Sequence, residues 1–376
     1  MGIEQRLVVR HAHTTRTSPA EAVSELREKL APLRSSASLL FCSPSYDLDA
    51  LGREIARAFP SPVGACTTAG QIGAGGYTSS GGITAVSLES SELAMRPYLI
   101  SPLGQCQARA AEVAFTAMSS LVERGKRRAF GLVFVDGLSG AEERLAASLY
   151  QSLGNVPLIG GSAADELAFR ATHVYHDGKF VRDAALFLLF ETTLPFTTLK
   201  VQHVVPTRHK LVVTAADPER RIVHEFNGEP AAEAYAEMLG VDLDELGSFL
   251  FSQNPVMIQS GGDHFIRVLR RMNPDKSLLS FCALEEGTVL TLGSSTEPLG
   301  ALERDFARAR ERIGEPAVVI ACDCVLRRME FEKRGTLDEI GGFLAKNAVV
   351  GFNTYGEQFD AIYVNQTFSA IALGSG

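Results

Sequence analysis

The densest group of side chains able to bind a ligand lies near the end of the chain. Asn353, Thr354, Tyr355 and Glu357 follow the apolar segment 349–352, and Asn365 stands at the start of the next apolar segment. Amide, hydroxyl, phenol and carboxylate groups together supply hydrogen-bond donors and acceptors. The pattern predicts a site for a small polar molecule, and the alternative is that these groups only cap a sheet.

Two earlier turns have the same character. Each of the three turns opens with a β-branched residue and a glycine, at Gly64, Gly160 and Gly351. The polar side chains of the two earlier turns are Thr67, Thr68, Ser162 and Asp165. Ligands of α/β sheets bind beyond the carboxyl ends of parallel strands. We therefore expect the three turns to converge on one face and to line a shared pocket.

Catalytic chemistry has weaker support. Ser162 follows two glycines and could act as a nucleophile, but no histidine stands at a recognisable partner position, and the known nucleophile-elbow and metalloprotease patterns are absent. His11 and His13 alternate along a strand, yet no third metal ligand follows at usable spacing. We predict neither an enzyme nor a metal site, and keep a hydrolase using Ser162 as the alternative from another functional class.

The elements that position these turns repeat along the chain. An apolar strand, a helix and a second apolar strand precede each turn, as in a right-handed parallel crossover. We place the three units at 1–100, 101–191 and 291–376, and expect Leu290–Leu292 to lead the third. Residues 192–290 read as mostly strands. The sequence predicts an α/β fold of repeated strand-helix-strand units in two domains, 1–200 and 201–376, with a β-rich insertion.

Composition limits the classes of partner. The chain has 376 residues, a net charge of −8 and a hydrophobic share of 45%. An acidic chain without a basic block is a poor binder of nucleic acid or of a membrane surface. Its longest apolar run, Ala184–Phe190, is far shorter than the roughly 20 residues of a spanning helix. With no apolar signal core at the start, we expect a cytoplasmic protein.

In three motifs the chain resembles the FIST family, intracellular signal-transduction sensors with a FIST N and a FIST C domain. The motifs are Val63–Gly70, Gly160–Asp165 and Gly351–Gln358 with Val364–Thr367. The resemblance covers nearly the whole chain and implies a FIST N-like domain at 1–200 and a FIST C-like domain at 201–376. It implies a small-ligand sensor that regulates a partner.

The spacing between Gly356 and Asn365 resembles the branch of haem-containing nitric-oxide sensors, which pair with histidine kinases or cyclic-di-GMP enzymes. Two residues depart from the family pattern: Gln71 replaces a glutamate, and Tyr363 stands where the haem branch has a histidine. Tyrosine is a haem ligand in some proteins. If haem binds here, we expect Tyr363 as its ligand, with His203, His209 and His264 next in line. The alternative is a haem-free sensor of a small polar metabolite such as an amino acid.

Overall fold

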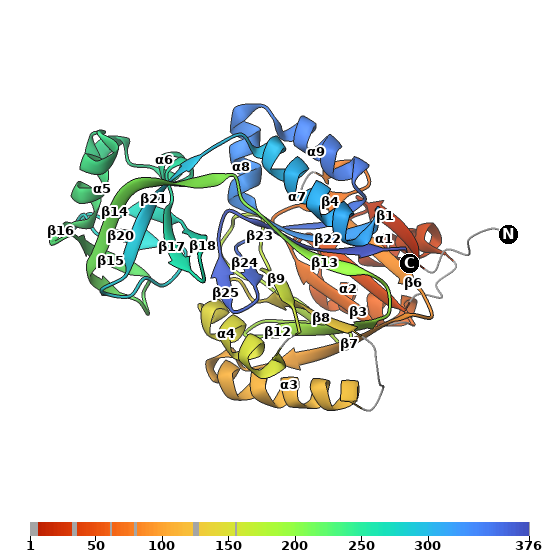
Figure 1. Ribbon diagram of the computed structural model, residues 1–376. Coiled ribbons are helices and arrows are strands. Elements are labelled where there is room, and N and C mark those ends of the chain that lie inside the picture. Colours follow the sequence, from red (N-terminus) through yellow and green to blue (C-terminus); the bar gives the residue numbers. More distant parts are fainter. Residues whose placement is uncertain are drawn as a thin grey trace. The chain divides into compact units, whose positions relative to one another are not determined.

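The computed structural model describes residues 7–31, 36–60, 62–78, 81–122, 128–154 and 156–375 (Figure 1). The chain forms two compact units. Unit 1 comprises Met1–Lys200, Glu303–Ile362 and Phe368–Gly376, and unit 2 comprises Val201–Leu302 and Tyr363–Thr367. Residues 1–200 thus fall in unit 1, whereas residues 201–376 are shared between the units.

Unit 1 contains three mixed sheets, one for each predicted repeat. The strands of the first sheet are, in order, β1 (Val8–Thr14), β6 (Ile83–Glu89), β2 (Ala37–Cys42), β3 (Val63–Thr67), β10 (Val174–His176) and β11 (Lys179–Val181). Those of the second are β24 (Glu357–Phe359), β9 (Leu158–Ser162), β8 (Arg128–Val135), β12 (Ala185–Thr192) and β7 (Leu93–Ile100), while β25 (Ile362–Val364), next to β24 in the strand order, has only Ile362 in unit 1. Those of the third are β13 (Phe196–Val201), β26 (Phe368–Gly374), β22 (Pro316–Cys324), β23 (Val349–Thr354), β4 (Gln71–Gly73) and β5 (Gly76–Thr78).

The three sheets share one strand order. An edge strand is followed by the antiparallel return strand and then by a parallel pair, which is β2 with β3, β8 with β9, and β22 with β23. This order confirms the predicted α/β fold of repeated units. The prediction that Leu290–Leu292 leads the third unit was wrong, because β21 (Val289–Ser295) pairs with strands of unit 2 and β13 takes that place. The residues inserted after β13 separate the leading strand from the rest of its repeat.

The repeats also exchange hairpins in a cycle. The β4–β5 hairpin, which follows the first turn, pairs with β23 of the third sheet. The β10–β11 hairpin, which follows the second turn, pairs with β3 of the first sheet. Strand β24, which follows the third turn, pairs with β9 of the second sheet. Each sheet is therefore completed by a segment from another repeat.

Helices cover the outer faces of the sheets. The helices of unit 1 are α1 (Pro19–Leu30), α2 (Leu48–Ala58), α3 (Cys106–Val122), α4 (Glu142–Leu153), α8 (Val325–Arg334) and α9 (Leu337–Lys346), while α7 (Pro298–Ile313) starts in unit 2. Asp47 caps α2 by accepting a hydrogen bond from the Ala50 amide at 3.0 Å. Leu51 and Ile55, one turn apart on α2, are fully buried over the first sheet. Helices α3 and α4 cover the second sheet in the same way (Figure 1).

The inner faces of the three sheets meet in one apolar core. Phe41 on β2, Phe134 on β8 and Phe352 on β23 are fully buried there. The Phe41 ring stacks on Phe352 at 5.0 Å between centroids, and Phe134 contacts both rings edge-on at 6.0 and 5.5 Å. Burying one such ring is worth roughly 1.5–3 kcal/mol. Strands covered on both faces read as continuous apolar runs, which explains the sequence of β2.

Unit 2 is the predicted β-rich insertion. Its strands are β14 (Val204–Asp217), β15 (Ile222–Phe226), β16 (Glu229–Pro230), β17 (Val256–Ser260), β18 (Asp263–Arg267), β19 (Leu269–Met272), β20 (Leu278–Ser280) and β21. All their pairings are antiparallel. The unit also contains α5 (Ala231–Leu239), which ends at Gly240 in the left-handed conformation, and α6 (Ser248–Gln253). In the described part of the chain, no helix combines the length and apolar character needed to cross a membrane.

Candidate functional site

The three predicted turns meet inside unit 1, where backbone hydrogen bonds join them in a ring. The Ala164 amide donates to the Thr67 carbonyl at 2.9 Å, which joins the second turn to the first. The Tyr355 amide donates to the Ser162 carbonyl at 3.2 Å, which joins the third turn to the second. The Ala69 amide donates to the Asn353 carbonyl at 3.0 Å and closes the ring. We call this region the polar centre; its residues are Thr67, Thr68, Gln71, Ser162, Asp165, Asn353, Thr354, Tyr355, Glu357 and Gln358.

In the first turn, the hydroxyl groups are held by neighbouring strands. Thr67 accepts a hydrogen bond from the His173 amide at 3.0 Å through its Oγ1. Thr68 donates to the Cys42 carbonyl at 3.2 Å and accepts from Gln71 Nε2 at 3.1 Å. Thr67, Thr68 and Gln71 are all fully buried. The first turn is therefore tied both to β2 and to the segment leading into β10.

In the second turn, Asp165 organises the loop that follows it. Its carboxylate accepts hydrogen bonds from the amides of Phe169, Arg170 and Ala171 at 2.7–2.9 Å, and from the Tyr355 hydroxyl at 2.5 Å. Burial and the neighbouring carboxylate raise the pKa of Tyr355, so its hydroxyl remains a donor at neutral pH. The carboxylate thus accepts from four donors of the protein, and one of them, the Tyr355 hydroxyl, links the second turn to the third.

In the third turn, Asn353 connects to charges that the sequence analysis overlooked. Its Nδ2 donates to Asp323 Oδ2 at 3.3 Å, and its Oδ1 accepts from Arg328 Nη1 at 3.3 Å. Asp323 in turn accepts from Arg327 Nε at 2.8 Å and from the Tyr77 hydroxyl at 2.6 Å. The four-residue spacing of Asp323 and Arg327 at a strand-to-helix junction was a usable signal. No sequence signal pointed to Tyr77, because it lies far from Asp323 in the sequence.

Glu357 and Gln358 complete the polar centre, and both are fully buried. The Thr354 hydroxyl donates to Glu357. Gln358 Nε2 donates to Ser162 Oγ at 3.2 Å, while Gln358 Oε1 is buried with no hydrogen-bond partner among the described residues. Ser369 Oγ on β26 is in the same condition. Buried polar atoms are normally satisfied by protein, water or a ligand, and these two atoms have no protein partner among the described residues.

Asn365 belongs to unit 2. The residue is 1% exposed, and both its side-chain Oδ1 and Nδ2 lack hydrogen-bond partners in the part of the chain that is described. It is therefore a second buried amide with unmet hydrogen-bonding capacity. Its assignment to the ligand site remains a prediction.

The residues predicted to hold haem all lie in unit 2. Tyr363 is 3% exposed, its ring faces the Arg221 guanidinium at 5.8 Å, and its carbonyl accepts from Arg267 at 2.6 Å. His203 is buried, His264 is half-buried and His209 is exposed on β14. In the described ranges, no three His, Cys, Asp or Glu side chains are grouped to hold a metal ion. The binding of haem through any of these four residues therefore stays a prediction.

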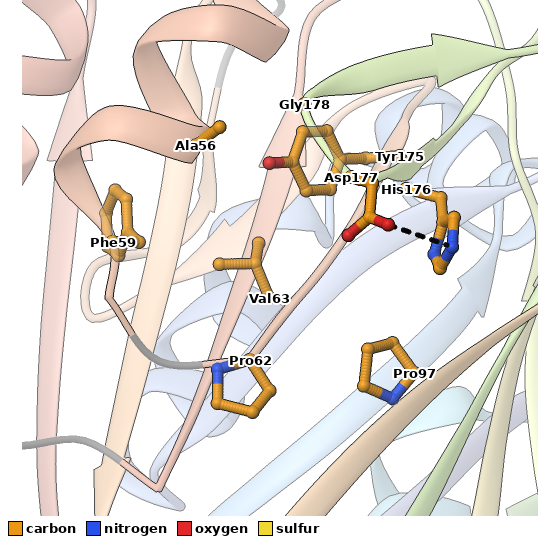
Figure 2. A pocket seen from close by; sticks show the side chains of 9 residues that line it. All are labelled: Ala56, Phe59, Pro62, Val63, Pro97, Tyr175, His176, Asp177 and Gly178. Atoms are coloured by element: carbon orange, nitrogen blue, oxygen red, sulfur yellow. Dashed lines mark ion pairs between the residues drawn. The ribbon is translucent and has the colours of Figure 1, made fainter.

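Open hollows on the surface lie away from the polar centre. One lies at the β10–β11 hairpin (Figure 2), a second lies beside it along α2, and a third lies next to Gly104 and Arg144. None of the three is lined by a residue of the polar centre or by the four haem candidates.

Known proteins resemble this chain in the following ways. A family model described as the FIST N domain matches residues 36–229, and one described as the FIST C domain matches residues 231–360. An uncharacterized protein of Methanocaldococcus jannaschii, MJ1623, is 33% identical over 109 residues, which are 29% of this chain and 21% of that protein. The chain thus matches about a fifth of that relative's length.

Among solved structures, T. maritima PurL complexed with AMPPCP aligns over 99% of this chain and 73% of its own chain. The TM-score is 0.20 and the sequence identity is 12%, so this likeness carries no argument. The two family models together span most of the chain, and they coincide with the motifs of all three turns. The chain belongs to the FIST family, whose domains are sensors of small ligands in signal transduction rather than catalysts.

Proposed function

We propose that this protein senses a small polar molecule at the polar centre and passes its state to a partner protein by contact. The observation that carries the proposal is Gln358 Oε1, a fully buried acceptor without a hydrogen-bond partner among the described residues, at the place where three turns meet. A ligand with a hydrogen-bond donor, such as the ammonium group of an amino acid, satisfies this acceptor. Because the three turns are bonded to one another, a ligand there acts on all three repeats.

Titration calorimetry and thermal unfolding with a panel of amino acids and other small polar metabolites test this proposal. A ligand at a hundred times its Kd stabilises the folded state by about 2.7 kcal/mol. Gln358→Leu should weaken binding about tenfold, since a hydrogen bond contributes roughly 0.5–1.5 kcal/mol. The same change should alter the stability of the ligand-free protein by no more than about 1 kcal/mol, because it removes both the unsatisfied Oε1 and the hydrogen bond from Nε2 to Ser162, and the two effects oppose each other.

Gln151→Leu, on the exposed face of α4, is the matched control and should bind like the natural sequence. Equal affinity of Gln358→Leu and the natural protein would move the ligand away from Gln358. If no compound of the panel changed the unfolding temperature, the proposal of a polar metabolite would fail.

The family resemblance supports a narrower proposal, which is haem-based nitric-oxide sensing with a histidine kinase or a cyclic-di-GMP enzyme as partner. Titration with haemin tests it directly. Uptake with a Soret band that Tyr363→Phe alters would support a phenolate ligand, and an unchanged spectrum in that variant would point to His203, His209 or His264. Addition of the purified sensor to a kinase or cyclase assay, with and without ligand, tests the output.

A hydrolase using Ser162 has less support. The Ser162 side chain is fully buried, and its hydroxyl accepts from the Gln358 amide nitrogen, which is not a base. A serine nucleophile needs a base within hydrogen-bond reach. The arrangement therefore favours binding over acyl transfer at this residue.

A further inference from the structure

Two surface hollows flank the turn of the β10–β11 hairpin. The first has a volume of 380 Å³ and the second 630 Å³, and both are lined by Ala56, Asp177 and Gly178. Pockets that hold ligands usually measure about 300–1,000 Å³. The hollows therefore adjoin at these three residues, which we call the ridge, and a molecule filling both contacts the hairpin turn.

The ridge is fixed by close packing of α2 against the turn. Asp177 and Gly178 both have positive φ angles, 46° and 80°, which favours a tight two-residue hairpin. A Cβ atom placed on Gly52 of α2 would come within 2.4 Å of the Gly178 carbonyl oxygen. Backbone therefore touches backbone there, and the two hollows keep their positions relative to each other.

The first hollow is apolar on one side. Phe59, Pro62, Val63 and Pro97 line it, and Figure 2 shows their side chains around the cavity with Tyr175 beside the turn. The Tyr175 ring packs edge-on against Phe180 at 5.4 Å, which holds it in place. Anchored recognition sites in protein interfaces are commonly such pockets, filled by one large apolar or aromatic side chain.

The second hollow gathers cations in a chain whose net charge is −8. Arg53 and Arg57 are one turn apart on α2, and Lys179 lies on β11. Arg57 pairs with Glu54 at 2.9 Å, whereas Arg53 and Lys179 form no ion pair within the described residues. Two acids also line the hollows, namely Asp49 and Asp177, and Asp177 lies 3.7 Å from His176. Lys179 and Arg53 are thus the groups available to an incoming carboxylate.

We propose that these two hollows form the surface on which a partner protein docks, and that the partner supplies acidic side chains next to one large apolar side chain. A peptide spans the ridge that separates the hollows, with its apolar group in the first and its carboxylates at Arg53 and Lys179. This proposal rests on the proposed sensor function, because it locates the output of that sensor.

A short covalent and hydrogen-bonded path joins this surface to the polar centre. Strand β10 pairs with β3, with Val174 opposite Cys66 and Tyr175 opposite Ala65. One residue earlier, the Thr67 amide donates to the His173 carbonyl at 3.0 Å, and the His173 amide donates back to Thr67 Oγ1 at 3.0 Å. Thr67 is therefore connected to the hairpin turn by two hydrogen bonds and strand β10.

Fluorescence polarisation with synthetic peptides tests the docking surface on the full chain without any sensed ligand. The probes are labelled decapeptides with four Asp or Glu residues around one central Phe or Leu. Matched peptides carry Asn and Gln for the acids, or Ala for the apolar residue. We expect acidic peptides with Phe or Leu to bind at least tenfold more tightly than both matched sets, and to lose affinity as salt rises.

Charge reversal identifies the residues. Arg53→Glu with Lys179→Glu should weaken binding at least tenfold, and Pro62→Glu should weaken it by obstructing the apolar hollow. Arg208→Glu with Lys346→Glu changes the net charge equally at exposed positions outside the hollows and should have no such effect. All variants are checked for unchanged unfolding temperature.

Three outcomes overturn the proposal: acidic and neutral peptides that bind equally, an equal effect of both charge reversals, or competition by inorganic phosphate as strong as by peptide, which would assign the hollow to a small anion. Because no sensed ligand is present, these outcomes are independent of the test on Gln358. Loss of ligand binding with intact peptide binding would reject the sensor site alone.

Discussion

At the scale of single residues, unit 1 contains an ion pair between Asp323 and Arg327 whose burial is costly unless both charges are compensated. The two side chains are 0% and 1% exposed, and Arg327 Nε donates to Asp323 Oδ1 at 2.8 Å. Burial and the neighbouring carboxylate raise the pKa of Tyr77 well above its ordinary value, so this hydroxyl also donates to Asp323 at neutral pH. Buried charges persist only when compensated in this way.

Breaking this pair from one side should therefore be costly. Asp323→Asn leaves a buried guanidinium without its counter-charge, and the expected loss in free energy of unfolding is about 3–5 kcal/mol. Asp323→Leu combined with Arg327→Met removes both charges and should recover most of that loss. Denaturant unfolding followed by circular dichroism measures both.

The exposed pair of Asp305 and Arg308 is the control, with Arg308 67% exposed. Asp305→Asn should change stability by no more than about 1 kcal/mol. An equal, small effect of Asp323→Asn and Asp305→Asn would mean that the buried pair is not what holds the third turn.

At the scale of elements, the sequence was informative about strands and turns and uninformative about how they pair. Apolar runs located the parallel strands, because a strand buried on both faces has a local signature. The prediction that Gly64, Gly160 and Gly351 open the turns was wrong in its bounds, since these glycines lie inside β3, β9 and β23 and the turns begin after the strands end. The hairpin exchange has no local signature: Ile72 pairs with Gly351 from another repeat, and nothing near Ile72 in the sequence encodes that partner. The contact of Tyr77 with Asp323 could not be predicted for the same reason, because the two residues are far apart in the sequence. The four-residue spacing of Asp323 and Arg327 did predict a pair, although the sequence analysis did not use it.

In the exchanged β4–β5 hairpin, replacing Gly76 by alanine should destabilise the protein, whereas replacing the neighbouring Gly75 should not. Gly76 has a φ of 91°, and a Cβ atom there would lie 2.5 Å from the Gly341 carbonyl oxygen on α9. Gly76→Ala should cost at least about 2 kcal/mol, since backbone strain and overlap add. At Gly75 a Cβ atom would meet nothing within 4 Å, so Gly75→Ala should be neutral or slightly stabilising. Thermal unfolding of the two variants tests this prediction. Equal unfolding temperatures would show that the hairpin is not closely packed against α9.

At the scale of the whole of unit 1, the cyclic exchange makes the three repeats depend on one another. The first sheet needs β10 from the second repeat, the second needs β24 from the third, and the third needs β4 from the first. The shared core, with one phenylalanine from each sheet in mutual contact, adds a second dependence. Unit 1 therefore should unfold as one cooperative body, although its segments are interrupted in the sequence.

This dependence predicts the behaviour of the fragment 1–200. That fragment keeps the first two repeats but lacks β22, β23, β24 and β26. Strand β4 therefore keeps only β5 and β9 keeps only β8, while the rings of Phe41 and Phe134 lose Phe352. Exposed strand edges and an open apolar core favour aggregation over folding. We expect the fragment alone to show no cooperative thermal transition and a broad, poorly dispersed amide NMR spectrum. Its co-expression with residues 303–376 should restore a cooperative transition, which controls for damage from truncation itself. If the fragment 1–200 unfolded cooperatively on its own, the first two repeats would form a domain that is stable without the strands of the third, and the cyclic exchange would not be required for folding.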